Sequence, residues 1–148
     1  WPQSSAFSES LSKKHQILSP SDFGLHNAIW ENSGKLRVID LEYFGWDDPV
    51  KLASDFWWHP AMSLEHPLRR QWISGMHDLF SQDQDFENRL KIAHPLYGLR
   101  WAMIVMKPFL SSAAASFDRE HVLQNQLHKS MMFCDIAKDW VERGDYQF

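Results

Sequence analysis

The chain has 148 residues, of which 44% are apolar and 23% charged, so it is long enough for one compact domain of ordinary composition. Its net charge of −4 argues against a nucleic-acid partner, because such proteins usually carry a basic face. No apolar run approaches the roughly 20 residues that a membrane-spanning helix needs, so we expect no membrane partner either.

The first 15 residues are polar and rich in serine, and they show no clear periodicity. We expect residues 1–15 to be a linker or a frayed end and residues 16–148 to form a single domain. The chain begins with Trp1 rather than Met, and we expect no signal peptide in it. We therefore expect it to be a piece of a longer protein that is cut or processed upstream.

Strand signals lie between residues 16 and 45. Residues 16–18 form a short extended run, and residues 36–39 alternate and are rich in branched side chains. The turn residues 32–34 separate this second run from residues 28–31. The pattern predicts a hairpin in which 28–31 pairs with 36–40, and no strand after Gly45.

The first two predicted helices begin at prolines. Asp47 or Asp48 can cap a helix that has Pro49 at its first position and runs to about Trp58, just before Pro60. The next helix opens at Pro67 and runs through Phe80. The sequence is thus typical of an α+β protein that is predominantly helical.

Two further helical segments are predicted. Asp83 or Asp85 can cap the first, which should break or restart at Pro95. Residues 96–106 are apolar on nearly every side, which predicts a buried central helix. The last helix is capped by Asp118, has apolar residues at helical spacing as far as Val141, and stops at Gly144.

The single cysteine, Cys134, excludes an intramolecular disulfide. It lies among apolar residues, so we predict a small buried side chain rather than a reactive thiol. The lack of disulfides is typical of a reducing compartment and predicts a cytoplasmic location.

Three short polar side chains are placed around the predicted hairpin. Asn27 precedes its first strand, Asp40 closes its second, and Asp22 lies five residues before Asn27. Antiparallel pairing brings the start of the first strand beside the end of the second, so Asn27 and Asp40 can approach one point. Carboxylate and amide oxygens suit Mg²⁺ that is bound jointly with phosphates. Asp22 can then reach a substrate hydroxyl next to the metal, as phosphoryl transfer requires.

The stretches SPSDFGLHN and VIDLEYFGWDDP carry this order. They resemble the catalytic and metal-binding loops of the protein-kinase-like fold, and more closely those of the aminoglycoside phosphotransferase and choline kinase family. That family has His-x-Asp-x4-Asn, followed by a strand ending in Ile-Asp, an aromatic residue and Glu. The match covers about residues 17–58.

The resemblance implies a kinase-like C-terminal lobe that phosphorylates a hydroxyl of a small-molecule acceptor with ATP, or another nucleoside triphosphate, and Mg²⁺. Asp22 takes the place of the catalytic aspartate, and Asn27 and Asp40 those of the residues that hold the metal and its nucleotide. The tripeptide Asp22-Phe23-Gly24 is then a coincidence, and Asp40-Leu41-Glu42 matches the metal-binding Asp-Phe-Gly.

Two departures from the family leave an alternative open. Pro20 stands where the family has histidine, and the chain has neither a glycine-rich phosphate loop nor the lysine of the N-terminal lobe. We therefore expect the isolated chain to be inactive without that lobe as a partner. The alternative is a catalytically inactive kinase-like or helical interaction module that binds a protein partner.

Aromatic residues and histidines each allow more than one interpretation. The eight tryptophans can build a core or face a missing partner domain, and Trp46, Trp57 and Trp58 can line an acceptor pocket or pack inside. The eight histidines show no tight spacing of three or four ligands, so no zinc site is predicted. His26 stands beside Asn27, where the simplest role is a loop residue that hydrogen-bonds the backbone.

Overall fold

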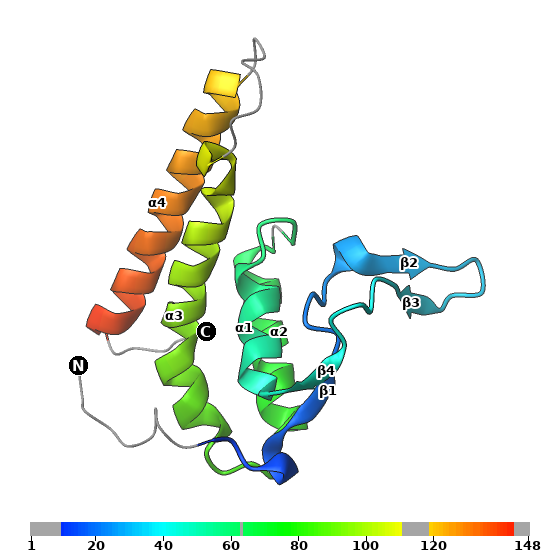
Figure 1. Cartoon of the computed structure of the whole chain (residues 1–148). Coiled ribbons are helices and arrows are strands. Elements are labelled where there is room, and N and C mark those ends of the chain that lie inside the picture. Colours follow the sequence, from blue (N-terminus) through cyan, green and yellow to red (C-terminus); the bar gives the residue numbers. More distant parts are fainter. Residues whose placement is uncertain (1–9, 63, 111–118, 144–148) are drawn as a thin grey trace.

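The computed structural model describes residues 10–62, 64–110 and 119–143. Within these ranges the protein is α+β and mainly helical, as the sequence predicts (Figure 1). Two small antiparallel sheets come first in the chain. Four helices follow: α1 (Pro49–Trp58), α2 (His66–Leu79), α3 (Phe86–Val105) and α4 (Arg119–Arg143).

The predicted hairpin is confirmed. Strand β2 (Ala28–Trp30) pairs with β3 (Leu36–Val38), and Ala28 lies opposite Val38. The hairpin projects away from the helices in Figure 1. Short 3₁₀ helices precede β1 and β2: η2 (Lys13–His15), within the predicted linker, and η3 (Leu25–Asn27). Residues 1–9 of that linker lie outside the described part.

A second strand pair was predicted only in part. Strand β1 (Ile17–Ser19) corresponds to the extended run, but its antiparallel partner β4 (Gly45–Asp47) is new, so the prediction that strands end by Gly45 is wrong. A three-residue segment is too short to show the alternation of apolar and polar residues by which a strand is predicted. Only pairing with β1, almost 30 residues earlier, makes this segment a strand.

Local signals place the first two helices correctly. The Oδ1 atom of Asp48 accepts a hydrogen bond of 2.9 Å from the N–H of Val50, and Pro49 occupies the first turn of α1. Helix α1 ends at Trp58, just before Pro60. Helix α2 begins at His66, one residue before the predicted Pro67.

Helix α3 runs without interruption through Pro95, so the predicted break is wrong. Proline removes one helical hydrogen bond and crowds the preceding turn, which costs about 3 kcal/mol in a helix interior. Pro95 is buried, and packing holds the helix on both sides of it, since His94 before it is completely buried and Ala102 after it is only 3% exposed. Tertiary packing on both sides of α3 therefore outweighs the local penalty.

Helix α3 is the centre of the helical body, packed against α1 and against α4 (Figure 1). The crossing with α1 depends on Gly98, where a Cβ would lie 2.6 Å from the ring of Trp58. Trp58 is 2% exposed, and its Nε1 donates a hydrogen bond of 2.9 Å to the carbonyl of His94. Buried side chains around this crossing form the core: Val50, Ala53, Trp57, Ile73, Met76, Phe86, Leu90, Trp101, Ala102, Val105, Phe133 and Ala137.

Residues 96–106 belong to this central helix, except for Met106 at its end, but they are not buried on every side. Leu99 and Met103 are exposed. Helix α4 buries only a narrow stripe, so Cys134 is exposed and the prediction of a buried cysteine is wrong. Its predicted cap Asp118 and stop Gly144 lie outside the described residues.

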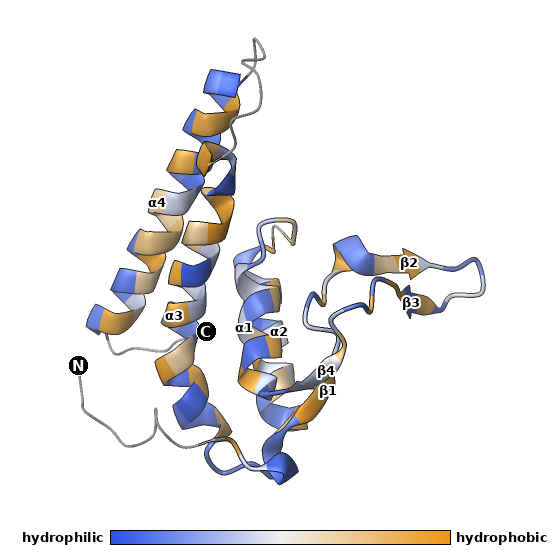
Figure 2. Cartoon of the chain, in the orientation of Figure 1, coloured by the Kyte–Doolittle hydropathy of each residue, from blue (hydrophilic) through white to orange (hydrophobic). Residues whose placement is uncertain are grey.

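Hydrophobic side chains also remain exposed on the hairpin, which is partly orange in Figure 2. Trp30 is 70% exposed, and Ile29 and Leu36 are about half exposed. Trp46 on β4 is exposed as well, whereas Trp57 and Trp58 belong to the core. None of the described helices is long and apolar enough to cross a membrane.

A half-buried arginine, Arg89, ties the start of α1 to the start of α3. The Nε atom of Arg89 lies 3.0 Å from Oδ2 of Asp48, and Nη2 lies 2.7 Å from Oδ2 of Asp83. The hydrogen bond from Arg89 is the main reason why the pKa of Asp83 falls below its ordinary value of 3.8.

We expect Asp83→Asn to lower the free energy of unfolding at pH 7 by about 1.5–3 kcal/mol, as for hydrogen bonds to charged groups. Because folding lowers the pKa of Asp83, its contribution is complete above pH 3.8 and is lost as the pH falls through the folded pKa. Urea unfolding at pH 7 and at acidic pH measures the free energy of unfolding of the unchanged protein and of the variant. Asp78→Asn, on exposed α2 surface, is the control; a loss for Asp83→Asn that is unchanged in acid contradicts the assignment.

Candidate functional site

The loop between β1 and β2, residues 20–27, carries Asp22 and is anchored on both sides of it. The ring of Phe23 packs against Phe56, 5.6 Å away, and stacks on Trp72 at 6.2 Å. On the other side, Nζ of Lys51 donates a hydrogen bond of 3.0 Å to the hydroxyl of Ser21. The loop is therefore held on α1 and α2 while the carboxylate of Asp22 remains 45% exposed.

Asp22 and Asn27 are in direct contact. The Nδ2 atom of Asn27 donates to the main-chain oxygen of Asp22 at 2.9 Å and to its Oδ2 at 3.2 Å. Asn27 is buried, at 8% exposure. Because its amide nitrogen is used on Asp22, its amide oxygen is left as the atom that can serve as a hard metal ligand.

Asp40 comes close to this pair through the backbone. The N–H of Ile39 donates a hydrogen bond of 2.9 Å to the carbonyl of Asn27, which sets Asp40 one residue beyond the end of the hairpin pairing. The side chain of Asp40 is exposed, and in the described part of the chain no hydrogen bond joins it to Asp22 or Asn27. The structure thus joins two of the three predicted side chains and brings the third beside them by its backbone.

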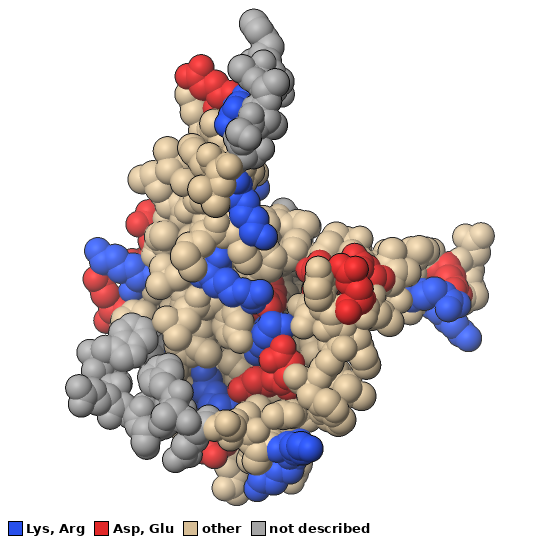
Figure 3. All heavy atoms as spheres, viewed as in Figure 1, with Lys and Arg blue, Asp and Glu red and all other residues tan. Residues whose placement is uncertain are grey.

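Negative charge gathers at this end of the hairpin. The pKa of Tyr43 is raised, first by its hydrogen bond to Glu42 and then by the charge of Glu42, with smaller effects from Asp40 and Asp22. Figure 3 shows acidic side chains grouped where the hairpin meets the helical body. Three carboxylates that act on one phenol form a field that favours a cation.

The backbone at the site is unusual. Among the described residues only two non-glycine residues have a positive φ, namely Ser21 at 60° and Asp40 at 58°. Such conformations cost about 1–3 kcal/mol each and tend to cluster where function requires them. One immediately precedes Asp22 and the other is Asp40 itself, so both mark the predicted site.

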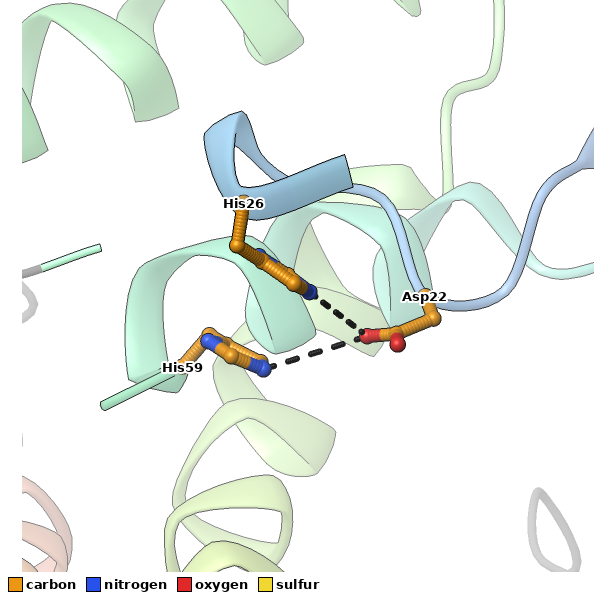
Figure 4. A group of neighbouring side chains, drawn as sticks. All are labelled: Asp22, His26 and His59. Carbon is orange, nitrogen blue, oxygen red and sulfur yellow. Dashed lines mark ion pairs between the residues drawn. The ribbon is translucent and has the colours of Figure 1, made fainter. Parts of the chain in front are cut away.

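Two histidines that the sequence did not connect lie beside Asp22 (Figure 4). The Nε2 atom of His26 is 3.4 Å from Oδ1 of Asp22, and Nε2 of His59 is 3.8 Å from the same oxygen. The two rings are stacked, with centroids 4.2 Å apart and planes at 10°. Burial and the neighbouring His26 lower the pKa of His59, while Asp22 acts in the opposite direction.

Gly24 makes room for this arrangement. A Cβ at this position would lie 2.5 Å from Nδ1 of His26 and 2.6 Å from the methyl group of Met62. A glycine two positions before His26 is the only local feature of the sequence that relates to this cluster. His59 follows α1 and is 33 positions beyond His26, so no spacing in the sequence could have revealed it.

The remaining predicted residues near the site have structural roles or are exposed. Asp48 caps α1, as the sequence predicts for Asp47 or Asp48, and Asp47 instead pairs with Lys51 at 2.9 Å. Glu42 is exposed.

Comparison with protein-family models, curated proteins and solved structures found no match to this chain.

Proposed function

We propose that this chain is the C-terminal lobe of a kinase-like phosphotransferase, which uses ATP or another nucleoside triphosphate to phosphorylate a hydroxyl group of a small molecule. The observation that carries the proposal is the contact of Asn27 with Asp22 on a loop whose hairpin returns Asp40 beside Asn27. The order of these residues is the one that the resemblance to the aminoglycoside phosphotransferase and choline kinase family implies.

Each residue has a distinct role in the proposed reaction. The exposed carboxylate of Asp22 orients the acceptor hydroxyl and accepts its proton. The amide oxygen of Asn27 and the carboxylate of Asp40 hold Mg²⁺, which offsets charge on the transferred phosphoryl group. The hydrogen bond from Nδ2 of Asn27 to Oδ2 of Asp22 fixes the distance between the residue that accepts the proton and a residue that holds the metal.

The proposal includes a second lobe that binds the nucleotide, in a cytoplasmic protein. The chain contains only six glycines and no glycine-rich loop. The exposed hydrophobic residues of the hairpin, Ile29, Trp30 and Leu36, support a partner lobe, because contiguous apolar surface usually marks an interface.

The metal-binding role is tested by thermal shift on a protein that contains this chain together with its nucleotide-binding lobe. ATP with Mg²⁺ should raise the melting temperature, because a ligand that binds only the folded state stabilises it. Asp40→Asn should remove most of this shift, and Asp139→Asn, on the exposed side of α4, should leave it unchanged. An equal shift in the Asp40 variant and the unchanged protein contradicts the proposal.

The second candidate is an inactive kinase-like or helical interaction module that binds a protein partner. The wide exposure of apolar residues on α4, including Met131 at 58% and Val141 at 50%, favours it. Absence of phosphate transfer in the two-lobed protein, together with retained partner binding, would support this candidate over the first.

A further inference from the structure

We propose that Asp22, His26 and His59 form an inhibitory binding site for a transition-metal ion of the Zn²⁺ class. Their three donor atoms, Oδ1 and two Nε2 atoms, all lie within 4.8 Å of one another, the sole such group in the described part of the chain. Figure 4 shows both Nε2 atoms directed at the same carboxylate oxygen. The inhibitory effect depends on the proposed function; the binding site does not.

The distances fit a shared metal better than direct hydrogen bonds. In a tetrahedral site, Zn²⁺ lies about 2.0–2.1 Å from each nitrogen or oxygen ligand atom, so any two of these ligand atoms are about 3.3 Å apart. The separations of 3.4 Å and 3.8 Å from Oδ1 of Asp22 are close to that spacing. They exceed the roughly 2.7–3.2 Å of N–H···O hydrogen bonds.

The ligand types and their supports also suit the ion. Two imidazoles and one carboxylate leave a fourth position for water, as in open zinc sites. His59 is held at the end of α1. Its backbone N–H donates a hydrogen bond of 2.9 Å to the carbonyl of Asp55, and its ring packs on Trp101. Asp22 and His26 side chains are 45% and 26% exposed, so an ion can enter from solvent.

Binding carries two costs, which predict an affinity lower than that of a structural zinc site. The stacked rings of His26 and His59 must tilt toward each other to share one ion. Nδ1 of His59 now accepts a hydrogen bond of 3.1 Å from the N–H of Ala61, so its proton is on Nε2. That proton must move to Nδ1 before the neutral ring can bind a metal through Nε2, and Nδ1 can then no longer accept the hydrogen bond from Ala61.

A bound ion would stop the proposed reaction without touching the Mg²⁺ ligands. It occupies the lone pair of Asp22 that accepts the proton of the acceptor hydroxyl. Micromolar free Zn²⁺ should therefore inhibit phosphate transfer even when Mg²⁺ is saturating.

The binding site is tested on the 148-residue chain with Zn²⁺ by calorimetry and with Co²⁺ by visible absorption. One equivalent should bind, and Co²⁺ should show the strong absorption of tetrahedral coordination. His26→Gln and His59→Gln should each weaken binding by at least about 10-fold, the lower limit even for residues that only support a ligand. His128→Gln, on exposed α4 surface, is the matched control.

Failure of this inference is distinguishable from failure of the proposed function. Binding that is absent, or that the His128 variant weakens as much as the other two, overturns the metal site. In the two-lobed protein, His59→Gln should raise the Zn²⁺ concentration for half-inhibition by at least 10-fold. Zn²⁺ binding by the chain in a protein that transfers no phosphate upholds the site and rejects the kinase activity.

Discussion

Replacement of Asp22 with Asn is expected to lower the rate of phosphate transfer by about 10²–10⁴-fold, the usual contribution of a general base. The amide keeps the shape of the side chain but cannot accept the proton of the acceptor hydroxyl. Asn27 still finds the main-chain oxygen of residue 22, which accepts a 2.9 Å hydrogen bond from it in the unchanged protein. The loop should therefore keep its conformation.

Transfer of labelled phosphate from ATP by the two-lobed protein measures this effect. The KM for ATP should change little, because Asp22 is not among the proposed nucleotide or metal ligands. Asp78→Asn, at an exposed position on α2, controls for the loss of one carboxylate. A protein with Asn at position 22 that keeps full turnover removes Asp22 from the proposed mechanism.

Replacement of Asp55 with Ala is expected to lower the free energy of unfolding by about 2–4 kcal/mol. The Nη1 atom of Arg100 lies 3.0 Å from both carboxylate oxygens of Asp55, and Nε1 of Trp101 donates to Oδ1 at 2.9 Å. Burial of Asp55 raises its pKa, and these partners offset part of that effect. Removing one partner of a fully buried pair costs about 3–5 kcal/mol. Because Arg100 is 47% exposed, water can solvate part of its charge and the loss should be smaller.

Chemical unfolding measures this loss, and Asp139→Ala is the matched control. Asp139 pairs with Arg143 at 3.0 Å, but both side chains are more than half exposed. Such pairs along a helix contribute about 0.3–0.5 kcal/mol. If both variants lose the same stability, the buried network around Asp55 does not hold α1 to α3.

Features with a short-range cause could be predicted from the sequence. Asp48 and Pro49 start α1 because a side-chain oxygen and a fixed φ satisfy the first turn within three residues. Turn residues 32–34 join two strands that are adjacent in the chain, so the hairpin and the approach of Asp40 to Asn27 followed from one local loop. The contact of Asn27 with Asp22 also spans only five residues, but the sequence placed the two on one loop without predicting that they touch.

Features that depend on distant partners could not be predicted. Pro95 remains inside α3 because packing on either side holds the helix together. Cys134 is exposed because α4 contacts the body along one narrow stripe, and an apolar neighbourhood in the sequence does not show which side faces the core.

The sequence by itself determined the α+β class, the hairpin, the first helix and the order of Asp22, Asn27 and Asp40, since each depends on interactions between residues close in the chain. Only the tertiary structure decided that β4 is a strand, that α3 is continuous, and that His59 lies beside Asp22. Those outcomes depend on contacts between segments about 30 or more residues apart, whose geometry is set when the helices pack together.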